Sequence, residues 1–292
     1  MKLFTTNLIA VFVVLSVRSA HGNWVFPDKV HLEFSDVLNK NCGDSSYTDW
    51  MKPEDGRPFE NPWLILFRHP EESEPFCQGT LITSQHVLTS AICSEGIVIN
   101  ETTVVVGEYD RSMNPECNAT NGCSTMTELF ALHKIVHPNF INESYEYDIA
   151  VVTLSEKLRY SNSVKPICLP LTPIIPSNVH TPLAYNALWP EKIVRPKQIQ
   201  MRYIPHLECR KFTQDLLALH EGQICAQMKY PAKISLIGGS GSPLLTEFHD
   251  RSFQFGILSI GMPDARSVEP FVYVNISTHI TWIHETVINS QT

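Results

Sequence analysis

The chain has 292 residues, 43% of them hydrophobic, and a formal net charge of −8 at pH 7. This length admits one large β domain or two smaller domains. Nucleic-acid binding is excluded as a function class, because the lysines and arginines are scattered and form no basic patch.

Residues 1–22, "MKLFTTNLIAVFVVLSVRSAHG", have the pattern of a secretory signal peptide. Lys2 precedes an apolar run over residues 8–17, and a small-x-small ending follows at residues 20–22. The run falls short of the roughly 18 residues that a membrane span needs. The alternative is a buried N-terminal helix. The signal peptide predicts a secreted, extracellular protein whose mature chain starts near Asn23.

Residues 23–50 show no strong periodicity and are interpreted as an extended arm. Beyond the arm, short runs rich in β-branched and aromatic residues recur between Gly, Pro and Asn. These runs predict strands at 62–67, 79–83, 86–90, 102–109, 131–137, 148–154, 198–204, 252–260 and 271–276. Many short strands at such spacing indicate an all-β sandwich or barrel.

Helix signals are few. Apolar residues at helical spacing predict a helix within 205–220 and an amphipathic one over 278–289, at the end of the chain. Residues 159–182 are rich in proline and separate two strand-rich halves, so we interpret them as a linker between two β subdomains.

The cysteines and the glycosylation sequons both fit an extracellular chain. An even number of cysteines favours disulfides over metal or redox chemistry, and the absence of any C-x-x-C pair argues against a zinc ribbon. The eight cysteines are Cys42, Cys77, Cys93, Cys117, Cys123, Cys168, Cys209 and Cys225. The Asn-x-Ser/Thr sequons lie at Asn100, Asn118, Asn142 and Asn275.

Two local patterns could indicate a metal or a phosphate site. His133 and His137 are four residues apart, but Lys134 stands where a zinc protease needs glutamate. On a strand the two histidines would be roughly 13 Å apart, which disfavours a shared metal ion. The glycines around Ser240 lack the Lys-Ser/Thr and the helix of a phosphate-binding loop, so Ser240 is either in an ordinary turn or a nucleophile.

The order of several motifs decides between these two readings of Ser240. "FCQGTLITSQHVLTSAIC", "YDIAVVTL", "VKPICLP", "LECRKF", "ICAQ", "GGSGSPLL", "GILSIG" and "FVYVNISTHITWI" follow one another over residues 51–292. In order and spacing they resemble the chymotrypsin-like (trypsin-type) serine proteases. The "NCG" arm and the "GEYDRSMNPEC" insertion are similar to arthropod immune serine proteases and their inactive homologues.

The resemblance implies a fold and a disulfide pattern. The fold is two perpendicular six-stranded antiparallel β-barrels with the active site in the cleft between them, and a C-terminal helix. The implied disulfides are Cys77–Cys93, Cys209–Cys225, Cys42–Cys168 and Cys117–Cys123. The family's bridge beside the nucleophile is missing, because Leu236 stands at the first cysteine's place and residues 262–270 contain no cysteine.

The resemblance also identifies the remnants of a catalytic triad. A serine needs a base to accept its proton, and a buried carboxylate orients that base. Asp148 matches the carboxylate and Ser240 the nucleophile, but the family's T-A-A-H-C motif reads "TSAIC" here, with Ile92 at the base position. His86, His133 and His137 do not match that position, so we expect none of them to replace the base.

Other family features have changed as well. The family's G-D-S-G-G reads "GGSGS", with Gly239 replacing the aspartate that pairs with a new N-terminus after activation. No activation sequence occurs around residues 49–51. Gly238 and Ser240 match the oxyanion-hole donors. The specificity pocket would have Ile234 as its floor and a wall formed by Ser259, Ile260 and Gly261.

The sequence therefore predicts a secreted serine protease homologue without catalysis or cofactor, which binds extracellular proteins such as cascade proteases or their substrates. A role in immunity is less well supported, because the chain lacks a six-cysteine clip domain. The alternative is an active endopeptidase with an irregular base. A third hypothesis is calcium binding at Glu108, the one matching ligand in its loop; we favour no metal site.

Overall fold

The computed structural model describes residues 32–45, 47, 55–113, 116–118, 122–171, 184–189, 192–213, 219–230, 239–261 and 270–290. The predicted signal peptide, residues 1–22, lies outside the described residues. So do Ile234, Leu236 and Gly238 of the predicted specificity pocket and oxyanion hole.

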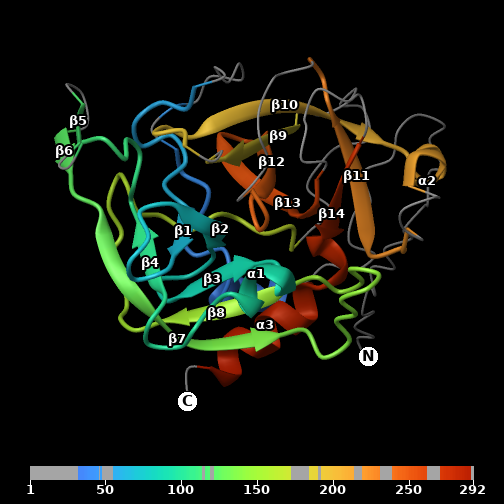
Figure 1. Cartoon of the computed structure of the whole chain (residues 1–292), viewed down its shortest axis with the longest axis horizontal. Coiled ribbons are helices and arrows are strands. Elements are labelled where there is room, and N and C mark those ends of the chain that lie inside the picture. The colour runs from blue at the N-terminus through green and yellow to red at the C-terminus, as the bar shows by residue number, and fades with distance from the viewer. Residues whose placement is uncertain are drawn as a thin grey trace, which may run out of the picture.

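Two closed six-stranded barrels lie next to each other and form the body of the molecule (Figure 1). The first has the strand order β1-β2-β3-β8-β7-β4. Its strands are β1 (Leu64–Arg68), β2 (Pro75–Leu81), β3 (His86–Thr89), β4 (Thr103–Val106), β7 (Thr127–Val136) and β8 (Ala150–Leu154).

The second barrel has the order β10-β11-β14-β13-β12-β9. Its strands are β9 (Ala184–Leu188), β10 (Lys197–Ile204), β11 (Gln223–Met228), β12 (Pro243–Phe248), β13 (Arg251–Ile260) and β14 (Phe271–Asn275). All neighbouring strands pair antiparallel in both barrels. The predicted fold class is therefore confirmed.

Short helices and one hairpin complete the described elements. They are η1 (Leu32–Asp36), α1 (Ala91–Glu95), α2 (His206–Thr213), η2 (Ile276–Thr278) and α3 (Ile280–Asn289), with the hairpin β5 (Glu116–Asn118) and β6 (Gly122–Ser124). None of these helices, within the part of the chain that the structure describes, is long and apolar enough to cross a bilayer.

The unbroken apolar runs in the first barrel reflect burial on both faces of its strands. In β8, Val152 and Leu154 point into the first barrel's core, whereas Val151 belongs to the core between the barrels. β4 shows the same alternation, with Val105 in the central core. Because successive side chains of a strand point to opposite faces, a strand between two cores needs apolar residues at every position.

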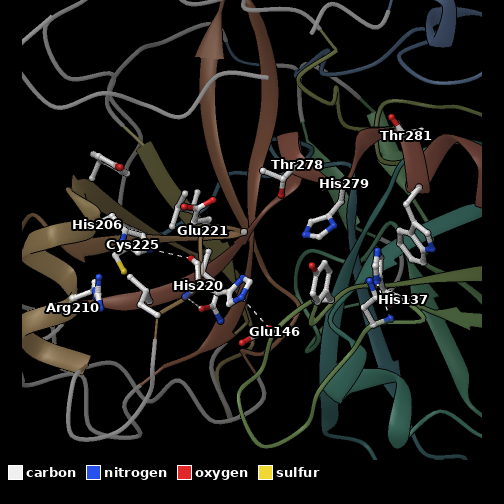
Figure 2. Close-up of a pocket in the computed structure, with 18 of the residues that line it drawn as sticks. His137, Glu146, His206, Arg210, His220, Glu221, Cys225, Thr278, His279 and Thr281 are labelled. Carbon is white, nitrogen blue, oxygen red and sulfur yellow. Dashed lines mark hydrogen bonds and ion pairs between the residues drawn. The ribbon is translucent and has the colours of Figure 1, made fainter. Parts of the chain in front are cut away.

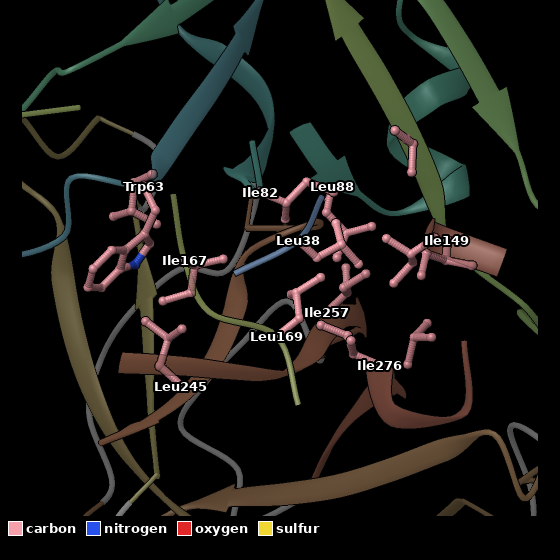
Figure 3. Packing of buried hydrophobic residues seen from close by; sticks show 14 of the residues in the cluster. Leu38, Trp63, Ile82, Leu88, Ile149, Ile167, Leu169, Leu245, Ile257 and Ile276 are labelled. Atoms are coloured by element: carbon pink, nitrogen blue, oxygen red, sulfur yellow. The ribbon is translucent and has the colours of Figure 1, made fainter. Parts of the chain in front are cut away.

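The central core lies in the seam between the barrels and is built from segments far apart in the sequence (Figure 3). Trp63 of the first barrel and Leu245 of the second are both buried in it. Ile167 and Leu169, from the predicted linker, also pack there. Residues 163–171 of that linker are therefore largely buried, whereas residues 159–162 are exposed or half-buried.

The sequence predicts an extended N-terminal arm, but part of the arm is helical. Residues 32–36 form the 3-10 helix η1, and Leu38 is fully buried in the seam. Asn39 accepts a hydrogen bond from the Leu169 backbone N and donates one to the Leu169 carbonyl, at 2.7 and 2.8 Å. The arm thus contributes to the central core.

All eight cysteines form the disulfides that the resemblance implied: Cys42–Cys168, Cys77–Cys93, Cys117–Cys123 and Cys209–Cys225. The first ties the arm to the linker, the second ties β2 to α1, and the third closes the β5–β6 hairpin. The fourth anchors α2 on β11. These elements are therefore held in place covalently.

Candidate functional site

The three residues that match a catalytic triad come from separate elements that meet between the barrels. Ile92 is the second residue of α1, whose N-cap Ser90 accepts a hydrogen bond from the Cys93 backbone N. Asp148 precedes β8, and Ser240 lies in the turn before β12. The Ile92 backbone N donates to Asp148 Oδ1 at 2.9 Å, and Cys93 Sγ lies 3.2 Å from the Ser240 carbonyl oxygen.

Asp148 is fully buried and is held by donors from both barrels. The Ser259 hydroxyl donates to Oδ2, while the Ile92 backbone N donates to Oδ1. Burial raises the pKa of the Asp148 carboxyl to about 6, although hydrogen bonds from Ser259, Ile92 and Ala91 act in the opposite direction. The carboxylate is thus positioned to orient a base, but the side chain beside it is a hydrocarbon.

The turn at Ser240 requires a glycine at the next position. Gly241 has φ +84°, and a Cβ atom there would lie 2.0 Å from the Gln78 carbonyl oxygen. The turn is bonded to both barrels: the Gln78 backbone N donates to the Ser240 carbonyl, and the Gly241 backbone N donates to the Leu258 carbonyl. Ser240 is therefore half-buried in a defined position and is not part of a loose surface loop.

None of the three histidines considered as substitutes lies at the base position. His86 is buried and bonds Thr83 Oγ1 and Ser290 Oγ. His133 is exposed on β7, and the His137 ring stacks on Tyr147 with 4.7 Å between ring centroids. Within the described residues, no histidine contacts Asp148 or Ser240 through a hydrogen bond.

Comparison with known proteins agrees with this geometry. A family model described as Trypsin matches residues 53–283. The chain belongs to the trypsin family. The family predicted from the sequence is therefore confirmed.

The trypsin-family chain is similar to two longer insect proteins. It is 29% identical over 238 residues to a venom serine protease of Bombus ignitus, covering 75% of this chain and 63% of that protein. It is 28% identical over 263 residues to serine protease 7 of Drosophila melanogaster, covering 84% of this chain and 67% of that protein. The match thus spans about two thirds of each relative's length.

A solved structure has the same fold. The crystal structure of the Drosophila Grass clip serine protease of the Toll pathway superposes with a TM-score of 0.74 at 22% identity. The superposition covers 87% of this chain and 76% of that one. At this identity the likeness shows the fold alone.

Ser259 has a role that the sequence did not reveal. The sequence predicts Ser259, Ile260 and Gly261 as the wall of a specificity pocket, and the Ser259 hydroxyl in addition donates to Asp148. The available signal was a lone serine within the apolar run "GILSIG", because a buried hydroxyl needs a partner. Ile260 and Gly261 are partly buried at the end of β13.

The loop after Gly107 is held by an ion pair. Arg195 Nε donates to Asp110 Oδ2 at 2.7 Å, and Asp110 is buried. Glu108 accepts a hydrogen bond from the Tyr109 backbone N. Among the described residues, no group of three or more His, Cys, Asp or Glu side chains is arranged to hold a metal ion, near Glu108 or elsewhere.

The structure separates the predicted sequons. Asn100 and Asn142 are exposed, and Asn118 is the last residue of β5. Asn275 is only 1% exposed, and its side chain caps η2 by accepting from the Ser277 backbone N. A glycan on this buried amide has no space in the folded barrel, so the prediction for Asn275 is wrong for the folded protein.

Proposed function

We propose that this protein is a secreted, non-catalytic member of the trypsin family that acts by binding other extracellular proteins. The observation that carries the proposal is Ile92, whose backbone N bonds Asp148 while its hydrocarbon side chain occupies the base position. A serine hydroxyl near neutral pH is a poor nucleophile unless a neighbouring group accepts its proton. Ile92 has no atom that can do so.

The size of the effect supports the proposal. Removing the histidine from a serine protease triad lowers turnover on the order of 10⁶-fold. That factor corresponds to roughly 8 kcal/mol of transition-state stabilisation. Without a base, the remaining residues of the site would contribute only substrate binding and some electrostatic stabilisation of the transition state.

The activation switch has changed together with the base. Gly239, which is buried, occupies the position of the family's aspartate, so no carboxylate is present there to pair with a new N-terminal ammonium. Residues 49–51 read Asp-Trp-Met instead of a basic activation site. Both changes fit a chain that has abandoned proteolysis.

An extracellular cascade is the setting we propose. The four disulfides suit an oxidising compartment, and the signal-peptide pattern over residues 1–22 points to secretion. One structural relative is described as a protease of the Toll pathway. In such a cascade the protein would act as a cofactor, a scaffold or a decoy for cascade proteases or their substrates.

A fluorophosphonate probe tests the absence of catalysis directly, because labelling requires an activated serine hydroxyl. We expect the purified mature protein to label no faster than its Ser240→Ala variant, while active trypsin in the same buffer labels fully. Labelling that depends on Ser240 and reaches completion within minutes would favour the alternative, an endopeptidase with an irregular base.

A further inference from the structure

A groove on the seam between the barrels has no role in the chemistry described above. It has a volume of about 1030 Å³, and several of its lining residues are labelled in Figure 2. Its described lining residues do not include Ile92, Asp148 or Ser240. Its described lining comes from the connection between β7 and β8, from the end of β10 with α2, from the residues entering β11, and from the end of η2 with the beginning of α3. The Cys209–Cys225 disulfide fixes α2 against β11, so the groove is already formed in the free protein.

One wall of the groove consists of packed rings. His137 lies between Tyr147 and Trp282, with centroid distances of 4.7 and 4.9 Å, and His279 meets His137 edge-on at 5.3 Å. Tyr147 directly precedes Asp148 in the chain. Aromatic faces attract cations through the negative potential of their π-systems.

His279 presents an unused acceptor to the groove. Its side chain is 5% exposed, it lines the groove, and neither ring nitrogen forms a hydrogen bond with any described residue. Its Nε2 lies 3.7 Å from where a side chain on Gly222 would begin, so the bare glycine leaves the nitrogen accessible. Burial lowers the pKa of His279 to about 4, which keeps the ring neutral and able to accept at neutral pH.

The charged side chains around the groove favour a positively charged ligand. Among the described residues that line it are three carboxylates, those of Glu146, Glu221 and Glu285, and one guanidinium, that of Arg210. Glu221 and Glu285 are exposed, and Glu146 lies 3.2 Å from His220 Nε2. The carboxylates belong to three different segments of the chain, which enter the groove from separate elements.

We propose that this groove binds an extended segment of a partner protein that carries arginine or lysine side chains. Its volume is at the upper end of the about 300–1,000 Å³ typical of small-molecule sites, which suits several residues of a polypeptide. A basic side chain would place its N–H groups toward His279 and the ring wall, and neighbouring basic residues would meet the glutamates. This inference rests on the proposed function, binding of other extracellular proteins, and adds the chemical class of the partner.

The test uses a fluorescein-labelled octapeptide of alternating arginine and glycine, with a glutamate–glycine octapeptide as the charge control. Fluorescence anisotropy is measured on the full mature protein at pH 8, where exposed imidazoles are neutral. We expect saturable binding of the arginine peptide alone. Absence of binding at millimolar protein, or equal binding of the two peptides, would overturn the proposal.

Matched variants locate the binding. The pair Glu221→Gln and Glu285→Gln should weaken binding about five-fold or more. The pair Glu71→Gln and Glu72→Gln removes the same charge from the exposed β1–β2 connection and should change the affinity less than two-fold. Equal losses in both pairs would mean attraction to net charge only, and would overturn the site.

His279→Phe tests the acceptor separately, since it keeps a ring in the wall and removes the nitrogen. We expect weaker peptide binding with an unchanged thermal midpoint; unchanged binding would remove His279 from the site. If His279→Phe misfolds, the comparison of the two glutamate pairs still tests the site. None of these readouts involves Ser240, so failure here leaves the covalent-probe result standing, and labelling of Ser240 would leave the groove result standing.

Discussion

At position 92 a hydrocarbon side chain lies beside a carboxylate that is still held as a triad carboxylate would be. Asp148 keeps its hydrogen bonds from Ser259 and from the Ile92 backbone. The donors are the backbone N of residue 92 and the Ser259 hydroxyl on β13, so neither bond involves the side chain at position 92. An isoleucine at position 92 therefore leaves these hydrogen bonds of Asp148 in place, although its own side chain cannot accept a proton.

Restoring the base alone should not restore a protease. In Ile92→His the imidazole would meet Asp148, yet the oxyanion donors would lack the ion pair that anchors them, and one lost donor costs about 3–4 kcal/mol. We expect at most slow hydrolysis of p-nitrophenyl acetate, and none of a peptide substrate. Adding Ser240→Ala should abolish the gain; family-like peptide hydrolysis by the single variant would contradict the expectation.

Gly241 is the position where the turn at Ser240 tolerates no side chain. Gly241→Ala would force a Cβ against the Gln78 carbonyl at φ +84°, and should lower the free energy of unfolding by about 2–4 kcal/mol. Thermal unfolding with the disulfides intact measures the change. Gly222→Ala is the control, because its Cβ would make ordinary contacts of 3.7 Å or more. An equal shift in both variants would refute the steric argument.

At the scale of elements, buried histidines join strands of the first barrel to the C-terminal helix. His86 of β3 bonds Ser290 at the end of α3, and His279 precedes α3 and packs against His137. Burial lowers the pKa of His86 and of His279 from 6.5 to about 4. Protonation therefore favours the unfolded chain over this pH range.

The sign of the resulting pH dependence follows from linkage. The depressed histidine pKa values give stability that is complete above about pH 6.5 and is lost toward pH 4. Asp148 acts oppositely, because its raised pKa of about 6 makes the folded state bind a proton more readily on acidification. Two histidines against one aspartate leave a net loss of stability at acidic pH.

His86→Gln should reduce this acid sensitivity. The amide can keep a hydrogen bond in the His86 site but does not titrate, so the variant should lose about 3 kcal/mol less stability than the parent between pH 7 and 4. Urea unfolding at a series of pH values measures the difference. A similar slope in parent and His86→Gln would contradict the assignment.

At the scale of the molecule, the barrels, the linker and the arm share one core. Leu38 of the arm, Leu169 of the linker and Leu245 of the second barrel are all buried in the seam. The Cys42–Cys168 disulfide closes a loop across 126 residues of sequence. The arm is thus retained as part of the folded unit.

Proteolysis near the arm should neither activate the protein nor release the arm. A trypsin nick between residues 45 and 60 creates a new N-terminus, but Gly239 offers no carboxylate to receive it. After the trypsin is inhibited, we expect no peptidase activity, and the arm should separate from the body on gels only under reducing conditions. Activity that survives trypsin inhibition, and is absent from a nicked Ser240→Ala control, would overturn the proposed lack of catalysis.

Much of the strand pattern was predictable, because apolar runs in β1, β3, β4, β8, β13 and β14 are strong local signals. β9 was missed, since Ala184–Leu188 follows the proline-rich linker and contains a central Asn186. α1 was missed because five residues show no helical period. α2 was expected within 205–220, and the described helix ends at Thr213.

By itself, the sequence determined the composition of the site. Ile92 lacks a lone pair, Gly239 lacks a carboxylate, and the cysteine positions matched the family pairing; these are properties of single residues at motif positions. The tertiary structure alone decided which distant groups meet. Ser259 reaches Asp148, Asn275 is buried, and His279 opens onto the groove beside three glutamates, because closing two barrels on one seam juxtaposes side chains whose proximity has no signature along the chain.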